Sequence, residues 1–245
     1  MQSKITIQAG PRFQPIFGDF ESAVETLTDI LQYIEGMAPE AKLRLVIFNN
    51  TIVALSATIE ESLRSLFQEY LSILEDTFCD CRELREMLQF TNLDCAIKDL
   101  KKCKSYGGLK SAANIVSNLE KCLKGHKGYQ LLKEQLVYNQ GNFRSLQVTD
   151  ISKNIGIPNL WYRICDAPEI EAYTGDLKVD ARVTRMTSQW NEIFDERDLV
   201  VHRISQASGW ASGRIQQSID LSKIIVNRIA ICLSEDTDEL ITKMI

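Results

Sequence analysis

Apolar residues recur every three or four positions over about residues 40–74, which is the period of one face of an α-helix. The series is long and has no strand-like alternation, so this stretch is predicted to form a helix with one buried seam. The members of the seam are Leu45, Phe48, Ile52, Leu55, Ile59, Leu63, Leu66 and Tyr70.

Three other stretches show signals of long helices, over about residues 19–36, 177–207 and 211–244. Asp19 is a suitable N-cap for the first of them, and Pro15 limits helix formation before it. The last two are separated by the short polar sequence "SGWASG".

The middle of the chain, about residues 80–175, breaks into shorter helical segments punctuated by "YGGL", "KGHKG" and "NQGN". We therefore predict an all-α fold: a helical bundle of long antiparallel helices with a shorter helical insertion. We expect a single domain over residues 1–245, with its core at about 19–76 and 176–245.

Bulk composition is that of a globular protein of 245 residues, 44% hydrophobic and 25% charged, with a net charge of −5. The chain has no apolar run of signal-peptide or transmembrane type, so a cytoplasmic protein without a membrane partner is expected. Its seven cysteines are scattered with no CxxC pair, which predicts reduced thiols and no metal site.

Lysine is concentrated in residues 98–133, which contain nine lysines and two acidic residues, a net charge of +7 that leaves −12 for the remainder. A basic face of this kind can bind a phosphate backbone, and we take Lys101, Lys102, Lys104 and Lys110 as candidate nucleic-acid contacts. The alternative is a solvated lysine-rich surface, because the stretch has no arginine and few aromatic residues for base stacking.

The stretch "WNEIFDERDLVVHRISQ", residues 190–206, has an interrupted apolar seam. The seam runs through Val183, Met186, Trp190, Ile193, Val200, Ile204 and Ala207. Arg197 occupies the position between Ile193 and Val200 where the register requires an apolar side chain. A buried unpaired guanidinium is costly, so Arg197 must form an ion pair, reach water or contact a ligand.

A second line on the same helix is polar, with members three and four residues apart: Asn191, Asp195, Asp198, His202 and Ser205. Asp198 precedes His202 by one turn and can favour the charged form of its ring. The alternative interpretation is structural, with His202 facing solvent and Arg197 extending its charge to water.

Three segments carry a family resemblance. "ERDLVVHR" fits the R-x4-H motif of HEPN domains, with Arg197 and His202 as its ends and polar Asp198 after the arginine. "LSATIEESLRSLF", residues 55–67, is similar to their first long core helix, with Glu60 near its middle. "GNFRSLQVTDISKNIGIP", residues 141–158, resembles the region upstream of the motif in RiboL-PSP-type HEPN proteins. The resemblance spans most of residues 40–235 and does not cover the N-terminal helix or the lysine-rich insertion.

The resemblance implies a metal-independent endoribonuclease that needs no cofactor and acts as a homodimer with a composite site. His202 would be the general acid or base, Arg197 would stabilise charge on the phosphate, and Asp198 would orient both. Glu60, Asn191 and Asp195 are supporting candidates. The RNA 2′-hydroxyl would attack and leave a 2′,3′-cyclic phosphate. Such proteins serve as toxins or in phage defence, often with an antitoxin or regulatory partner protein.

Two other functions stay open from the sequence. The chain can be a catalytically silent HEPN-type module that binds RNA, a nucleotide or a protein partner through the same residues. It can also be an unrelated helical scaffold protein in which the motif occurs by coincidence, since an arginine shortly before a histidine is a common pair.

Overall fold

The structure is a computed structural model that describes residues 10–37, 40–106, 108–137, 142–202 and 210–242. Within these ranges it contains ten α-helices, one short 3-10 helix and no β-strand, which confirms the predicted all-α fold. The elements are α1 (Gln14–Met37), α2 (Ala41–Thr77), η1 (Cys81–Glu83), α3 (Glu86–Tyr106), α4 (Gly108–Lys124), α5 (Lys133–Val137), α6 (Ser145–Asn154), α7 (Leu160–Cys165), α8 (Pro168–Thr174), α9 (Val179–His202) and α10 (Ser212–Thr242).

The first helix starts earlier than the sequence indicated. α1 begins at Gln14, so Asp19 lies inside the helix and the prediction that it is the N-cap is wrong. Pro15 stands in the first turn, where a missing N–H removes no helical hydrogen bond, and it therefore does not stop the helix. At the other end of the chain, α9 is described as far as His202, and its expected continuation to Ala207 lies outside the described residues.

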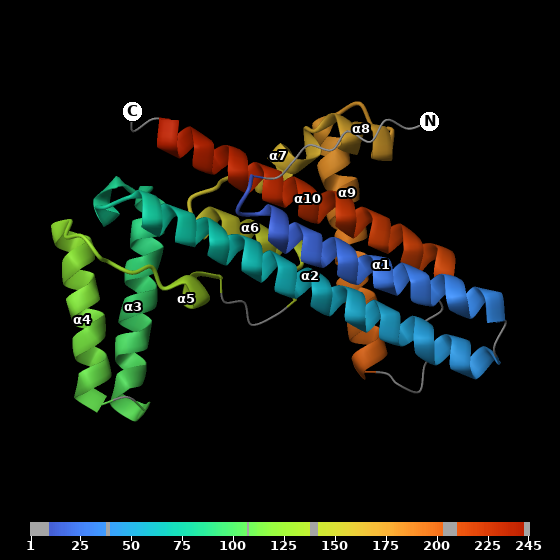
Figure 1. Ribbon diagram of the computed structural model, residues 1–245, viewed down its shortest axis with the longest axis horizontal. Helices are drawn as coiled ribbons and strands as arrows, with labels where there is room; N and C mark the ends of the chain where they lie inside the picture. The colour runs from blue at the N-terminus through green and yellow to red at the C-terminus, as the bar shows by residue number, and fades with distance from the viewer. Residues whose placement is uncertain (1–9, 38–39, 107, 138–141, 203–209, 243–245) are drawn as a thin grey trace.

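Three long helices, α1, α2 and α10, lie side by side along the length of the molecule (Figure 1). α1 is antiparallel to the other two, because Arg12 bonds Asp76 near the end of α2 while Glu35 accepts from Ser212 at the start of α10. α2 and α10 run in the same direction. α9 crosses them steeply and packs against both α2 and α10.

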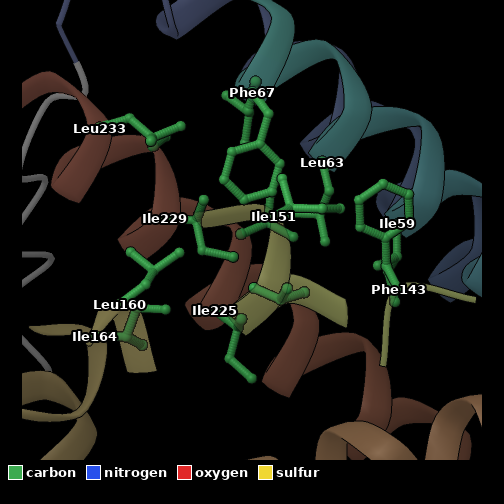
Figure 2. Packing of buried hydrophobic residues seen from close by; sticks show 14 of the residues in the cluster. Ile59, Leu63, Phe67, Phe143, Ile151, Leu160, Ile164, Ile225, Ile229 and Leu233 are labelled. Carbon is green, nitrogen blue, oxygen red and sulfur yellow. The ribbon is translucent and has the colours of Figure 1, made fainter. Parts of the chain in front are cut away.

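The predicted seam of α2 lies at the centre of the core. From Ile52 to Tyr70 its members are almost completely buried, while Leu45 near the first turns is half-buried. Figure 2 shows part of the buried cluster, with side chains from α2, α10, α6, α7 and the segment before α6: Ile59, Leu63, Phe67, Phe143, Ile151, Leu160, Ile164, Ile225, Ile229 and Leu233. Residues from the middle of the chain therefore complete the core that the terminal helices begin.

The middle of the chain divides into two parts. α5 to α8 contribute buried residues to the core. α3 and α4 instead form a hairpin that extends away from one end of the bundle (Figure 1). α4 packs against α3 and η1, and Gly125 and Gly128 after it have positive φ, as expected of the glycines in "KGHKG".

α2 is long and apolar enough to cross a membrane by length and composition, with a mean hydropathy of 1.2 over 18 residues. One third of that window, 33%, is buried inside the protein. Core helices of globular proteins pass the same test, and α2 places a continuous line of buried residues from Phe48 to Leu74 in the bundle. Leu43 and Val46 near its start are exposed.

A buried ion cluster, which we call the Asp236 cluster, joins α2, α7 and α10 to the segment before α3. Asp236 accepts hydrogen bonds from Tyr70 Oη at 2.7 Å, Arg85 Nη2 at 2.8 Å and Arg163 Nη1 at 3.0 Å. Arg85 also donates to the carbonyl oxygen of Gly156 at 2.7 Å. Burial and the adjacent carboxylate raise the pKa of Tyr70 far above its usual range, so the phenol keeps its proton and remains a donor.

Candidate functional site

A short segment, Asn142 to Ser145, is fixed across the face of α9 and forms one wall of the candidate site. We call it the strap. Trp190 Nε1 donates to the carbonyl oxygen of Phe143 at 2.7 Å, and Trp161 Nε1 donates to that of Ser145 at 2.9 Å. Asn191 bonds Ser145 twice, accepting from its backbone N–H at 2.8 Å and donating to its hydroxyl at 3.0 Å. The Phe143 ring is buried in the core.

The polar stripe predicted on α9 faces this strap. Asp195 and Asp198 both pair with Arg144, the latter at 2.8 Å from Nη2, and Asp198 also accepts from Asn142 Nδ2 at 3.0 Å. Asn191 bonds Ser145 as described above. The stripe is therefore polar because three of its members, Asn191, Asp195 and Asp198, hold the strap in place. Ser205, the last predicted member of the stripe, lies outside the described residues.

Arg197 has the ion pair that its position required. Its side chain is about one third exposed, at 31%, and its Nη1 donates to Asp198 Oδ1 at 2.8 Å. Burial opposes ionisation of Asp198, but hydrogen bonds from Arg197, Asn142 and Arg144 outweigh it, so the pKa of Asp198 lies below its usual range. Asp198 is thus a fixed negative charge between two guanidinium groups.

Glu60 of α2 lies near enough to Arg197, Arg64 and Asp198 for their charges to act on its pKa. Its Oε1 is buried and forms no hydrogen bond with any residue that the structure describes. Burial raises the pKa of Glu60, and the nearby charges of Arg197 and Arg64 offset this only in part. A carboxyl group with an unpartnered buried oxygen and a raised pKa is a group that can accept or supply a proton.

Arg64 is four residues after Glu60 and lies on the same face of α2. Its guanidinium carbon is 5.9 Å from the centre of the Phe143 ring, and its Nη1 bonds Glu61 at 2.9 Å. The candidate site therefore brings three arginines, Arg64, Arg144 and Arg197, together with Glu60 and Asp198. Guanidinium groups at this density suit an anionic ligand such as a phosphate.

His202 is at the edge of this arrangement. It is exposed in the last described turn of α9 and forms no hydrogen bond or ion pair with another described residue. Asp198 directs its oxygens to the strap and to Arg197 rather than to the His202 ring. Among the described residues, the His202 ring is therefore exposed and has no partner.

The lysines predicted to contact nucleic acid do not lie near Arg197. Lys101, Lys102 and Lys110 are exposed on the α3–α4 hairpin, away from α9 (Figure 1), and the side chain of Lys104 is outside the described set. Lys102 pairs with Asp99 at 3.0 Å.

Lys101 and Lys102 also border a cleft of about 1110 Å³ between α3, α5 and α6. Its charged lining consists of Lys98, Lys101, Lys102, Asp94, Asp99, Glu134 and Asp150. A cleft with more acidic than basic groups is a poor phosphate channel. The structure therefore does not bring the lysines to the candidate site, and their contact with nucleic acid stays a prediction.

Arg64, Asn142 and Arg144 are site residues that the sequence analysis did not single out. Arg64 had a usable signal, since its spacing of four from Glu60 places both on one helix face. Asn142 and Arg144 lie in the segment 141–158 that resembles the region upstream of the motif, but no spacing rule connects them to α9, which is about 50 residues away.

Comparison with known proteins identifies the family. A sequence profile described as RiboL-PSP-HEPN matches residues 19–235. The chain belongs to the RiboL-PSP-HEPN family. The matched range begins within α1 and ends within α10, so it is wider than the resemblance noted from the sequence. No curated protein and no solved structure matches the chain. The family assignment makes an RNase-type domain the coarse expectation for the candidate site.

Proposed function

We propose that this RiboL-PSP-HEPN protein is a metal-independent endoribonuclease whose active site contains Arg197 and His202. The observation that carries the proposal is the position of Arg197: it is one third exposed, pairs with Asp198 and lies near enough to Glu60 for its charge to act on the pKa of that carboxyl. A charge in such a place has no role in packing the core. It supports binding of an anionic group at the R-x4-H motif.

The proposed chemistry is an internal transesterification of RNA. The 2′-oxygen bonds to the adjacent phosphorus while the bond from phosphorus to the 5′-oxygen breaks, which leaves a 2′,3′-cyclic phosphate and a 5′-hydroxyl. His202 removes the 2′-hydroxyl proton or donates one to the departing 5′-oxygen, for which an imidazole is suited near neutral pH. Arg197 stabilises the charge on the phosphate oxygens, and Asp198 holds the Arg197 side chain in position.

We also propose that the working form is a homodimer with a composite site. His202 is flanked on α9 by two exposed apolar residues, Leu199 and Val201. Ile30, Tyr33 and Met37 form an exposed line on α1 at a helical spacing of three and four. Pairing two copies through α9 covers apolar surface beside the motif and brings the arginines and histidines of both copies together.

Within a cell, we propose a cytoplasmic toxin or anti-phage effector with an antitoxin or other regulatory partner. The proposal follows from the chemistry, because an unrestrained ribonuclease is harmful to the cell that makes it. Expression in a bacterial host should slow growth, and the His202→Ala variant made at the same level should not. Equal growth inhibition by both would contradict the role of His202.

A second function is favoured by one observation. Asn191, Asp195 and Asp198 hold the strap, a structural task that needs no turnover. A silent module that binds RNA, a nucleotide or a protein in the same place would need the same contacts. Binding of labelled RNA without cleavage, lost in Arg197→Ala, would indicate this function.

The deciding experiment is RNA cleavage by purified protein in excess EDTA, with analysis of the product ends. Wild type should cleave, whereas His202→Ala and Arg197→Ala should lose about 100-fold or more of the rate. His126→Ala is the matched control, since His126 is the chain's other histidine and is exposed on the loop after α4. Equal cleavage by all four preparations would mean contamination or a different site.

A further inference from the structure

Two cysteines from separate elements meet where the α3–α4 hairpin joins the segment after α2. Cys81 lies in η1 and is buried, whereas Cys122 lies in the last turn of α4 and is half-buried. Both line one hollow of about 170 Å³. The Cys81 thiol donates a hydrogen bond to the Cys122 sulfur, so the two sulfurs are in contact although residues 82–121 separate them in the chain.

A glycine lets the end of α4 approach η1 closely. Gly125 has a φ of +70°, the left-handed conformation in which helices commonly end, and a Cβ there would clash with Arg82 Nη2 and Asp80 Oδ2. Asp80 also caps η1, since its Oδ1 accepts from the backbone N–H of Arg82 at 2.8 Å. Asn92 of α3 donates to Cys122 Sγ at 3.9 Å. The contact between the two thiols is therefore fixed by the packing of η1, α3 and α4.

The two thiols of this pair differ in reactivity. The hydrogen bond from Cys81 lowers the pKa of Cys122 and outweighs the opposing effect of burial. The same bond, together with burial, raises the pKa of Cys81 far above its usual range. Cys122 is thus the thiol that ionises and acts as a nucleophile, and Cys81 keeps its proton. An accessible cysteine with a lowered pKa beside a second cysteine is the usual arrangement of a redox-sensitive pair.

A second pair of neighbouring thiols provides a contrast within the same chain. Cys165 of α7 and Cys232 of α10 are completely buried in the core, and they lie near enough for Cys232 to act on the pKa of Cys165. Burial raises the pKa of Cys165 to about 12 and that of Cys232 to about 11, so both thiols stay protonated at neutral pH. Proximity alone therefore does not make a pair reactive, because the nucleophile must also be ionised and accessible.

We propose that Cys81 and Cys122 form a reversible disulfide when the protein meets a peroxide, a modification that the proposed ribonuclease chemistry does not involve. The hollow beside them has room for so small a molecule, since a water molecule takes up about 30 Å³ in the liquid.

The reaction has two steps. The Cys122 sulfur attacks one oxygen of hydrogen peroxide, the O–O bond breaks, and the departing hydroxide takes up the proton that Cys122 released. The Cys81 sulfur then bonds to the Cys122 sulfur and displaces its new hydroxyl group, which leaves as water with the Cys81 proton. Both sulfurs are oxidised, and the peroxide is reduced to two water molecules. A dithiol reductant reverses the change.

The disulfide would pin the hairpin to the bundle. α4 packs against α3 and η1, and η1 directly follows the long core helix α2. A covalent bond from η1 to α4 removes the openings of the hairpin in which α4 separates from η1. A zinc site is a poorer account of the pair, because the described residues hold no group of three or more histidine, cysteine, aspartate or glutamate side chains placed to share a metal ion.

The test treats the reduced full chain, freed of reductant, with about a tenfold molar excess of hydrogen peroxide. The remaining thiols are blocked with N-ethylmaleimide in denaturant, and the protein is digested without reductant for mass spectrometry. The linked Cys81–Cys122 peptide should exceed every other linked pair by about tenfold or more, and dithiothreitol should restore both thiols. Cys165 and Cys232 should stay unlinked. Amide hydrogen exchange in α4 should slow by about tenfold or more after oxidation.

Three variants assign the steps. Cys81→Ser removes the second thiol, so the sulfenic acid of Cys122 should persist and be trapped by dimedone. Cys122→Ser should abolish both the link and the slower exchange of α4. Cys79→Ser is the matched control, because Cys79 is an exposed cysteine two residues before Cys81, and this variant should oxidise like wild type. Circular dichroism checks that Cys81→Ser folds, and the half-buried Cys122→Ser decides the matter if it does not.

Three results would overturn the proposal. The first is oxidation of Cys122 to the sulfinic acid without a link, and the second is a dominant link through Cys79. The third is a linked protein in which α4 exchanges its amide hydrogens as fast as in the reduced protein. No step of the experiment uses RNA, so this proposal and the proposed ribonuclease activity can fail separately.

Discussion

Two clusters of arginines and carboxylates lie at different places on α2, and they differ in how completely their charges are satisfied. In the Asp236 cluster, the carboxylate is 4% exposed and accepts from Tyr70, Arg85 and Arg163. In the candidate site, the carboxylate of Asp198 is 33% exposed, and the buried Glu60 Oε1 has no partner among the described residues. The arginines of the two clusters are about equally exposed, at 28% in the Asp236 cluster and at 29% and 31% for Arg144 and Arg197.

The comparison shows that burial of charge alone does not identify a functional site. Both clusters perturb pKa values: the pKa of Tyr70 and that of Glu60 are raised, and the pKa of Asp198 is lowered. The Asp236 cluster is closed and satisfied, which is typical of a structural network. The candidate site has a more exposed carboxylate and one unpartnered buried oxygen, that of Glu60, which leaves groups available to a ligand.

The largest effect on stability is expected from Asp236→Ala. The substitution leaves Arg85 and Arg163 without their carboxylate, and removing one partner of a buried ion pair costs about 3–5 kcal/mol. The melting temperature should fall by about 6–20 °C. The control Asp238→Ala removes an exposed acid of the same helix and should change stability by no more than about 0.5 kcal/mol. Equal melting of the two variants would show that the Asp236 cluster does not stabilise the fold.

Arg197→Ala, in contrast to Asp236→Ala, should lower activity and leave stability almost unchanged. We expect the RNA cleavage rate to fall about 100- to 1000-fold, equivalent to about 2.7–4 kcal/mol, with a melting temperature within about 3 °C of wild type. Asp198 keeps Arg144 and Asn142 as partners, which is why the fold should tolerate the change. Arg185→Ala, on an exposed position of the same helix, should retain full activity. A large loss of stability in Arg197→Ala would make the candidate site a second structural cluster.

Asn191→Ala tests the strap. The Asn191 side chain bonds both the backbone and the hydroxyl of Ser145. Its removal should therefore lower the free energy of unfolding, measured in urea, by about 1–2 kcal/mol. In the double variant Asn191→Ala/Arg144→Ala, the loss of unfolding free energy should be smaller than the sum of the two single losses by about 0.5–1 kcal/mol, because both side chains hold one segment. Ser188→Ala, at an exposed position of α9, should be additive with Arg144→Ala. Additivity of the Asn191 and Arg144 changes would show that the strap is not one unit.

Glu60→Gln should have the smallest effect, and its sign depends on pH. The raised pKa of Glu60 means that the folded state favours the protonated carboxyl. Its contribution to stability is therefore present in acid and is lost as pH rises through the folded-state pKa. Glutamine mimics the protonated form, so the variant should melt up to about 3 °C higher than wild type near pH 7.5 and at the same temperature near pH 4.

The neighbouring Glu61→Gln is the control for that measurement, because Glu61 is exposed. It should show no such pH-dependent gain. The contribution of Asp198 to stability depends on pH in the opposite direction, because its pKa is lowered. That contribution is present at neutral pH and is lost as pH falls through the folded-state pKa. A higher melting temperature of Asp198→Asn than of wild type at neutral pH would contradict the ion pairs of the strap.

Much of the architecture was predictable from the sequence. The seam of α2 and the long helices at both ends follow from periodicity, because an apolar stripe three to four residues apart can be buried only as a helix face. Arg197 was predictable as an anomaly in such a stripe. The early start of α1 was not, because the sequence shows a proline but not its place in the first turn.

The sequence by itself determined the helical class and the position of the interrupted seam in α9, since both depend on contacts between residues three and four apart. Only the tertiary structure decided which groups meet at Arg197. Glu60, Arg144 and Asp198 are far apart in the chain, and packing of α2, α9 and the strap around Phe143 and Trp190 brings them together. Packing also left Leu109, Val116 and Leu123 of α4 exposed, although α4 packs against α3 and η1.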